Sequence, residues 1–263
     1  MKNFFTHTRR LLYLLLGAPD ILLGHRLPIV ILCYHSVSND SWLHSISLKQ
    51  FHSQIQYLSH NYKFISLSQL AKNRHFSSPV AAITFDDGYK DILIVAPLLK
   101  KYHIRPTVFV LSDTAHANRK ELENHKEFLS ISDLKALLRQ GWEIGSHSAT
   151  HPNLSSIPVS QITAEIVKSK KDLEKCLKTP IRYFAYPKSK FTPTVLSVVK
   201  SAGYLLGFSW AEPSIRDSSD PYRLARISPN STYSMTEFKA TLTPTLDSIS
   251  YLVKKSAQSF NLI

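Results

Sequence analysis

The sequence contains little cysteine, no internal repeat and no long apolar run. Its two cysteines, Cys33 and Cys176, are too few for a disulfide framework or a thiolate metal site. Cys33 stands in a strand-like apolar run and Cys176 in a helix-like run, and we expect both to be small buried side chains. The absence of repeats, low-complexity tracts and linkers excludes a repeat array. The 263 residues, 43% of them apolar, therefore fit one large α/β domain with a sizeable core.

Acidic residues are also scarce relative to basic ones. There are 19 Asp and Glu against 32 Lys and Arg, which gives a net charge of +13 and a pI near 9.7. This balance favours contact with an anionic partner such as a membrane surface, a polyanionic glycan or nucleic acid. The cations are spread along the chain, however, without a block of five or more. Nucleic acid is therefore an unlikely partner, and general solvation is the simplest alternative.

Residues 1–27 form a basic and apolar segment. Three basic residues precede the apolar run 11–16 (LLYLLL), and Pro19 interrupts the stretch that follows. The run is too short to span a bilayer, which needs about 20 apolar residues. Three interpretations stay open: a peripheral membrane helix, an export signal and a helix that simply packs on the protein. Residues 28–263 are expected to form the folded domain.

Strand-like and helix-like runs alternate after residue 27. The patterns predict strands at 28–34, 64–67, 80–85, 106–111, 142–146, 182–186 and 204–210. They predict helices at 47–60, 92–102, 130–140, 160–177 and 194–202, and loops at 112–127 and 211–223. Such alternation implies parallel strands joined by crossover helices. With about seven strands, the predicted fold is α/β, a distorted (β/α)7-type barrel that is TIM-barrel-like.

Two adjacent carboxylates, Asp86 and Asp87, follow the apolar strand 80–85 in a sharp turn. Like charges side by side repel, so a structural role for the pair requires a cation or a proton between them. About sixty residues further on, the end of another predicted strand supplies His147 and His151. One carboxylate and two imidazoles make a three-ligand metal site with open positions, and the second carboxylate stays free as a base. Both segments follow the C-terminal ends of strands, where β/α barrels gather their active sites.

Three segments in combination resemble the motifs of the polysaccharide deacetylase superfamily, carbohydrate esterase family four. Residues 84–88 (TFDDG) and 147–152 (HSATHP) resemble its first two motifs, and 184–187 (FAYP) resembles its third. The resemblance covers roughly residues 28–230. It implies a metal-dependent hydrolase that removes N-acetyl groups from an amino-sugar glycan, acting on carbon–nitrogen bonds other than peptide bonds.

The resemblance also implies a division of roles among the polar residues. Asp87, His147 and His151 would bind the metal, and Asp86 would be the general base. Zn²⁺ is the metal that this ligand set favours, with Co²⁺, Ni²⁺ or Fe²⁺ as alternatives. Several structural alternatives stay open. The aspartates could be a cap and turn pair, the two histidines a hydrogen-bonded loop pair, and His151 alone a partner of another ligand.

The acid that protonates the departing amine is expected near the N-terminus. Many members carry it in a C-terminal Leu-X-His motif, but residues 223–227 (RLARI) occupy that region here. Residues 31–37 (ILCYHSV) instead place His35 at the end of the first strand, which resembles the permuted, poly-N-acetylglucosamine deacetylase-like branch. His35 is therefore our candidate acid, and a loop histidine bonded to backbone is the alternative.

The third motif departs from the commonest family pattern. Ala185 stands where many members carry an Arg that orients the catalytic Asp, and Ser189 replaces a Gly. The backbone N–H of Lys188 is still expected to contribute to the oxyanion hole. We suggest that Arg226 supplies the missing positive charge near Asp86, with a surface ion pair as the alternative.

Four aromatic residues, Tyr34, Tyr89, Tyr186 and Trp210, fall at or near predicted strand ends. Their rings could stack on sugar rings or support the site from behind, although core packing is the commoner use of such residues.

The leading interpretation is a metal-dependent deacetylase at the cell envelope or membrane, and a cytoplasmic location stays open. Within the family, the alternative is deformylation or deacetylation of a lipid-linked sugar, which the basic and apolar N-terminus favours. The altered third motif suggests a catalytically inactive glycan-binding module as a further alternative. A two-histidine, one-carboxylate iron oxygenase is disfavoured by the paired aspartates and the β/α alternation.

Overall fold

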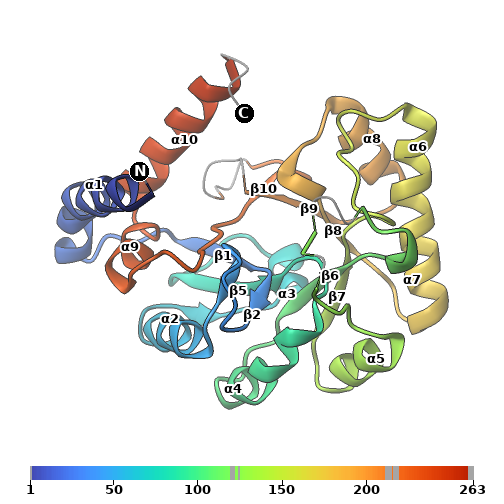
Figure 1. The fold of residues 1–263 in the computed structure, drawn as a ribbon, viewed down its shortest axis with the longest axis horizontal. Coiled ribbons are helices and arrows are strands. Elements are labelled where there is room, and N and C mark those ends of the chain that lie inside the picture. Colours follow the sequence, from blue (N-terminus) through green and yellow to red (C-terminus); the bar gives the residue numbers. More distant parts are fainter. Residues whose placement is uncertain (1, 119–121, 124, 211–214, 216–218, 260–263) are drawn as a thin grey trace.

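A curved parallel sheet forms the centre of the molecule. The computed structural model describes residues 2–118, 122–123, 125–210, 215 and 219–259. The sheet has the strand order β1-β5-β6-β7-β8-β9-β10, with β4 beside the start of β5 (Figure 1). Its strands are β1 (Ile29–Tyr34), β4 (Lys63–Phe64), β5 (Val80–Phe85), β6 (Thr107–Val110), β7 (Glu143–Ser146), β8 (Tyr183–Ala185), β9 (Leu206–Ser209) and β10 (Leu224–Ala225). A separate short pair, β2 (Ser36–Val37) and β3 (Ser45–Ile46), follows β1.

The two edges of this sheet meet just beyond β10. The N–H of Cys33 donates to the carbonyl of Ile227 at 2.8 Å, and the N–H of Ile227 donates to the carbonyl of Ile31 at 2.8 Å. These bonds join the first strand to the chain after the last one, so the sheet is a nearly closed barrel. The predicted TIM-barrel-like fold is confirmed.

Helices surround the barrel, as Figure 1 shows. They are α2 (Leu48–Asn61), α3 (Leu67–Lys72), η1 (Lys90–Val95), α4 (Ala96–Lys101), α5 (Ile131–Arg139), α6 (Val159–Thr163), η3 (Ala164–Lys168), α7 (Ser169–Leu177) and α8 (Pro193–Ser201). Ser47 caps α2 by accepting the N–H of Gln50, and Phe51, Ile55 and Leu58 bury one face of it. All five predicted crossover helices are present.

Both faces of the sheet are covered, so residues along the strands are buried continuously rather than alternately. In β1, Ile29 and Ile31 face the barrel interior, where they join Phe109 and Phe208. Leu32, from the alternate register, joins the layer between sheet and helices. All six residues of β1 are buried, which is the pattern that parallel sheets require.

The predicted strand at 64–67 is wrong in its extent. β4 ends at Phe64, the last bond to β5 runs from the Ile65 N–H to the Ala81 carbonyl, and α3 begins at Leu67. Ser66 accepts the N–H of Gln69, and the Gln69 side chain accepts the N–H of Ser66, so the two form a capping box. This local signal ends the strand because the box satisfies backbone donors at the start of a helix.

The prediction for the cysteines is half right. Cys33 is fully buried in β1, but Cys176 is exposed on α7. A helix has a solvent face, and residue type alone does not say which side Cys176 takes. The predicted loop at 112–127 contains the short helix η2 (Thr114–His116), and parts of this loop and of 211–223 lie outside the described residues.

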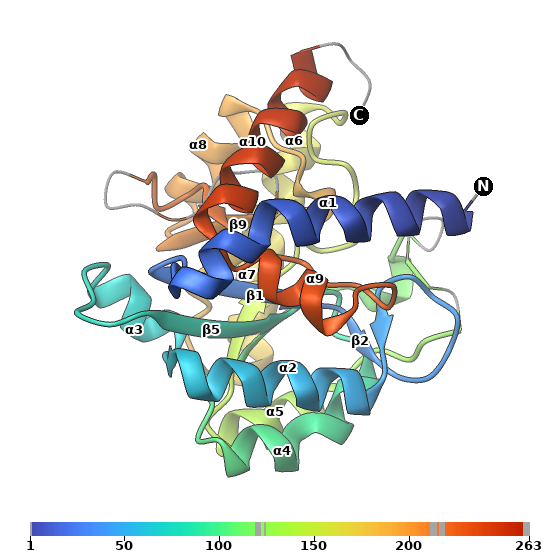
Figure 2. The same cartoon turned by 90° about the vertical axis from the view of Figure 1, so that its left-hand side faces the viewer.

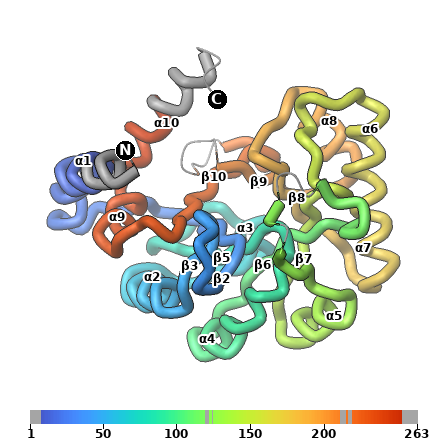
Figure 3. The backbone as a smooth tube through the Cα atoms, viewed as in Figure 1, coloured from blue at the N-terminus to red at the C-terminus, as the bar shows by residue number. Residues whose placement is uncertain are grey.

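The N-terminal segment is a helix, α1 (Lys2–Leu23), that lies beside two helices from the other end of the chain, α9 (Met235–Ala240) and α10 (Pro244–Ser259). Figures 2 and 3 show α1 at the edge of the molecule, outside α9, with α10 leaving the body next to it. The backbones approach closely, because a Cβ added at Gly17 would lie 2.6 Å from that of Ala240. Within the described residues, every helix is too short or too polar to cross a membrane. The division into 1–27 and 28–263 stays a prediction.

Candidate active site

The turn after β5 aims two neighbouring carboxylates in different directions. Asp86 and Asp87 are both buried, at 3% and 5% exposure. Asp87 has a φ of 67° and Gly88 a φ of 73°, and a Cβ on Gly88 would lie 2.8 Å from the Val110 side chain. The left-handed turn therefore needs a glycine where the chain passes β6. It sends Asp86 towards Arg226 and Asp87 towards the two histidines.

Asp87, His147 and His151 converge on one point. Asp87 Oδ1 lies 3.4 Å from His147 Nε2 and 3.6 Å from His151 Nε2. The carbonyl of Ala185 lies 2.8 Å from His147 Nδ1, and because a carbonyl only accepts, Nδ1 donates and Nε2 is the ring nitrogen left for a metal. His151 has a φ of 65°, and its N–H donates to Ser148 Oγ at 3.0 Å.

A divalent cation fits this donor set. Asp87 Oδ1 is buried and has no hydrogen-bond partner, although a buried unpaired carboxylate oxygen is costly. The potential ligand atoms of the three residues all lie within 4.8 Å of one another. Burial alone would raise the pKa of Asp87, but His147 and His151 hold it below its usual range, so the carboxylate is ionised. Two imidazoles and one carboxylate, with positions left open, are the ligands of a catalytic metal.

Glu165 supports the histidine loop and was not anticipated from the sequence. Its Oε2 accepts the N–H groups of Ala149 and Thr150 at 2.9 and 2.8 Å, and its Oε1 accepts the Thr150 hydroxyl at 2.7 Å. These bonds fix the loop between His147 and His151. The contact links η3 to the loop of His147 and His151, about fifteen residues earlier in the chain, and no local sequence pattern predicts it.

Arg226 binds Asp86 through both carboxylate oxygens. Arg226 Nη1 lies 2.6 Å from Asp86 Oδ1, and Nη2 lies 2.6 Å from Oδ2. Arg226 is 3% exposed, and its guanidinium lies over the rings of Phe109 and Phe208 inside the barrel. Burial would raise the pKa of Asp86, but the charge of Arg226 holds it below its usual value. Of the two predicted environments for Arg226, the structure places it against Asp86 and away from the surface.

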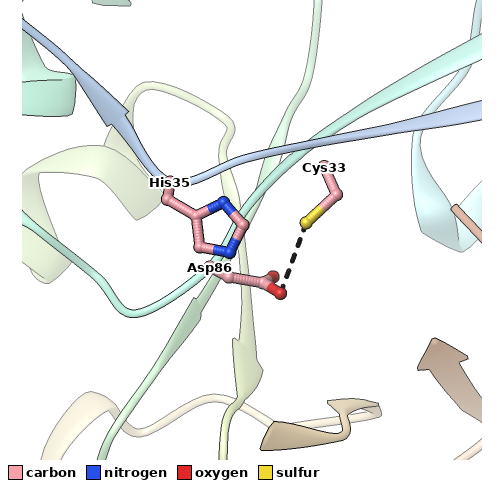
Figure 4. Close-up of side chains that lie close together, drawn as sticks. All are labelled: Cys33, His35 and Asp86. Atoms are coloured by element: carbon pink, nitrogen blue, oxygen red, sulfur yellow. Dashed lines mark hydrogen bonds between the residues drawn. The ribbon is translucent and has the colours of Figure 1, made fainter. Parts of the chain in front are cut away.

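A second cluster, of Cys33, His35 and Asp86, does not fit a cation. Figure 4 shows the His35 ring beside the Asp86 carboxylate, with Cys33 Sγ donating to Asp86 Oδ2 at 3.4 Å. The three groups are close enough for a metal. Both Asp86 oxygens already bind Arg226, however, and burial raises the pKa of the Cys33 thiol well above its usual value. A protonated thiol is neutral, and the charge of the carboxylate is already balanced by Arg226, so neither group has a free negative charge for a metal ion.

These groups open into one cleft of about 430 Å³. Its lining comprises His35, Trp42, His44, Asp86, Asp87, His147, His151, Tyr186, Lys188, Ser189, Lys190, Trp210 and Ser228. Trp42 and His44 were not anticipated, although a Trp-x-His segment shortly after His35 was available in the sequence as a signal. The rings of His35 and His44 are 4.8 Å apart, and burial lowers the pKa of His44 to about 4, so it is neutral.

The third-motif loop reaches the cleft with a left-handed backbone. Lys188 and Ser189 both have a φ of 57°. This explains why a glycine suits position 189, and Ser189 adopts the conformation here while its hydroxyl accepts the N–H of Trp210 at 2.9 Å. The loop places Lys188 in the cleft lining, where its backbone N–H is expected.

The four aromatic candidates separate into two groups. Tyr186 and the partly exposed Trp210 line the cleft. Tyr34 lies in the core, where its hydroxyl donates to Gln54 at 2.8 Å. Tyr89 is fully buried behind the cleft and packs against Trp42 at 5.6 Å between ring centroids. Tyr34 and Tyr89 are therefore positioned to support the walls and not to touch a ligand in the cleft.

The barrel and the buried Asp-His-His group define a class of hydrolase with a candidate metal centre at the C-terminal ends of the strands. The family model for polysaccharide deacetylase matches residues 73–207, about half of the chain. The chain is 31% identical over 198 residues to a poly-beta-1,6-N-acetyl-D-glucosamine N-deacetylase of Staphylococcus epidermidis, covering 70% of this chain and 68% of the relative. It is 30% identical over 145 residues to a peptidoglycan-N-acetylglucosamine deacetylase of Bacillus cereus, covering 54% of this chain and 62% of the relative.

Solved structures show the same fold. The deacetylase PplD of Streptococcus pyogenes, in complex with acetate, aligns with a TM-score of 0.71 and 24% identity, covering 83% of this chain and all of that one. IcaB of Ammonifex degensii aligns with a TM-score of 0.70 and 22% identity, covering 86% and 98%. This protein belongs to the polysaccharide deacetylase family. It is a hydrolase, as its motifs predicted.

Proposed function

We propose that the protein removes acetyl groups from N-acetylglucosamine units of a polysaccharide in the cell envelope, with a metal at Asp87, His147 and His151. The observation that supports this most is the buried, unpartnered Oδ1 of Asp87 facing two imidazole Nε2 atoms, next to a second, ionised carboxylate. The relatives named for poly-N-acetylglucosamine and peptidoglycan support the substrate class.

Zinc is the proposed metal, because a mixed set of nitrogen and oxygen ligands suits it. When bound, a divalent ion lowers the pKa of water and polarises the amide carbonyl. Asp87 supplies the negative charge for the ion, and Ala185 fixes the orientation of His147.

Asp86 is the proposed general base, which accepts the proton of the attacking water. Its carboxylate is ionised and held in one orientation by the fork of Arg226. A base fixed in this way needs no reorganisation when the water approaches. Arg226 thus takes the positioning role that Arg holds in the usual third motif.

His35 is the proposed acid for the departing amine, and the Lys188 N–H is the proposed donor to the developing oxyanion. Potential ligand atoms of His35 and Asp86 lie within 4.8 Å of one another, so both groups face the same part of the cleft. Burial lowers the pKa of His35, so its ring is neutral at rest and has to take up a proton before it can give one to the amine nitrogen. The Lys188 N–H is presented by a left-handed turn that leads into the cleft.

The test is acetate release from N-acetylglucosamine oligomers, with metal content measured on the same sample. Chelator-sensitive release that zinc restores would support the proposal. Bound metal without release from any acetylated glycan would contradict the substrate class, and failure to bind a metal after reconstitution would contradict the site.

A lipid-linked amino sugar is a second candidate substrate, which the apolar surface of α1 favours. The six leucines of α1 that are exposed among the described residues would suit a protein working next to lipid. Comparing acetate or formate release from a lipid-linked amino sugar with release from the oligomers decides between the two. A higher kcat/KM for the oligomers favours the polysaccharide.

A further inference from the structure

The outer side of α1 is an apolar surface with nothing packed on it in the described structure. Six of its leucines are exposed: Leu11, Leu12, Leu14, Leu15, Leu22 and Leu23. Leu15 is 66% exposed and Leu22 is 85% exposed, although soluble surfaces rarely gather so many large apolar side chains on one helix. We call these six residues the leucine face.

The leucine face cannot turn inward, because the opposite side of α1 already packs against α9 and α10. Gly17 sits against Ala240 of α9, and Asp20 is buried, where it accepts the N–H of Thr245 at 2.9 Å. At about 100° per residue, Gly17 and Asp20 project opposite to Leu15 and Leu22. Asp20 is the one ionisable acid or base between residues 11 and 23 besides Tyr13, so the exposed side of that span has no charge.

Basic residues flank the leucine face at both ends. Arg9 and Arg10 lie before it and share one buried carboxylate, Glu237, at 2.8 and 3.4 Å, which leaves a net positive charge there. His25 and Arg26 follow it and are both exposed. An apolar strip between cationic ends is complementary to a bilayer surface with anionic headgroups.

We propose that the leucine face is a membrane-docking surface, with α1 lying in the plane of an anionic bilayer at the boundary of headgroups and acyl chains. The helix is unsuited to crossing the bilayer. The apolar span from Leu11 to Leu23 is about 20 Å long at 1.5 Å per residue. Because it is a single convex helix without exposed acidic groups, it matches a flat anionic lipid surface better than a protein groove.

This docking surface lies near the catalytic cleft. Tyr13 of α1 and Ile31 of β1 line a groove of about 280 Å³ that also includes Trp210 and Ser228, which both line the cleft. Docking through α1 would therefore keep the cleft close to the membrane surface. This consequence rests on the proposed function, but the docking itself does not.

Vesicle sedimentation with the full chain tests the proposal. The probes are vesicles of phosphatidylcholine alone and vesicles that also contain phosphatidylglycerol. We expect binding to the anionic vesicles that weakens with salt. The double variant Leu15→Glu and Leu22→Glu should bind the anionic vesicles with an affinity at least about tenfold lower, because two exposed apolar anchors are lost and two negative charges are added.

The matched control is Ile94→Glu and Leu205→Glu, which changes two apolar side chains that are 54% and 48% exposed elsewhere on the surface. It adds the same charge and should bind nearly as well as the unmodified protein. Both double variants should keep the melting temperature and the rate of acetate release from soluble oligomers, so a failure of docking is distinguishable from a failure of the proposed function.

Three results would overturn the proposal. The first is absence of binding to anionic vesicles by the unmodified protein. The second is equal loss of binding in both double variants, which would reduce the effect to charge. The third is a concentration-dependent dimer that the leucine double variant abolishes while vesicles are not bound, since the occupant would then be a second copy of the chain.

Discussion

Arg226 holds Asp86 by both carboxylate oxygens, each at 2.6 Å, across 140 residues of sequence. This buried pair takes the place of an Arg within the third motif, where the chain has Ala185. The positive charge thus comes from the residue that follows β10 and not from the third-motif loop, yet it reaches the same kind of carboxylate.

Replacing Arg226 with Lys should lower kcat about tenfold to a hundredfold while metal content stays unchanged. Lysine keeps the charge but cannot bind two oxygens in a plane, so Asp86 loses its fixed orientation. Steady-state kinetics on N-acetylglucosamine oligomers measures the change. Arg223→Lys is the matched control, because Arg223 is exposed three residues earlier. A wild-type rate in Arg226→Lys would contradict the proposal that Arg226 positions Asp86.

Replacing each of the two adjacent aspartates should have a different effect on the enzyme. Asp86→Asn should retain the metal and lose about 10²-fold to 10⁴-fold in kcat, which is the usual contribution of a general base. Asp87→Asn should lose metal affinity first, and added metal should restore part of its activity. Metal analysis and acetate release on the same samples separate the two, with Asp113→Asn, at a partly exposed carboxylate outside the cleft lining, as the control. Equal metal loss in both variants would contradict the assigned roles.

His35→Gln should lose activity on amides far more than on activated esters. An amine needs a proton to leave, whereas the 4-nitrophenolate of 4-nitrophenyl acetate does not. We expect a loss of about 10²-fold or more on the oligomers and less than about tenfold on the ester. The control is His44→Gln, because the His44 ring lies next to that of His35, and it should change the rates on both substrates by the same factor. A parallel loss on both substrates in His35→Gln would exclude the acid role.

Glu237→Gln should weaken the attachment of α1 and lower the free energy of unfolding by about 1–3 kcal/mol. The buried carboxylate accepts from the Ser234 N–H at 2.8 Å and from Arg9 Nε at 2.8 Å, and both bonds weaken when it is neutral. Denaturant unfolding measures the loss. Glu127→Gln, whose partner Lys90 is also exposed, should change stability by less than about 0.5 kcal/mol.

The same carboxylate should make stability fall in acid. Burial raises the pKa of Glu237, but hydrogen bonds from Ser234 and the charge of Arg9 bring it below the usual value. A lowered folded pKa means that the stabilisation is complete above the unfolded pKa of about 4.3 and is lost as the pH falls through the folded one. Glu237→Gln should therefore show a smaller loss of stability below about pH 4 than the unmodified protein. An identical pH profile would contradict this assignment.

Much of the site was predictable because its ligands stand in short segments at the ends of apolar strands. Asp86 and Asp87 are adjacent, and His147 and His151 are four residues apart, so a parallel barrel brings both pairs to one face. The wall residues Trp42 and His44 were missed because they belong to a loop with no periodic pattern. Glu165 was missed because its contact depends on how η3 packs, which local spacing does not encode.

The strand and helix alternation, the family and the residues that can hold a metal were all predictable, because apolar periodicity and short motifs are local. Which charges meet and which apolar residues stay outside depended instead on how the chain folds. Arg226 reaches Asp86 because closure of the barrel brings β10 back to β1. The leucines of α1 face outward because Gly17 and Asp20 occupy the side that packs on α9 and α10. Both outcomes depend on contacts between the two ends of the chain, and such contacts are set by packing and not by the neighbours of a residue in sequence.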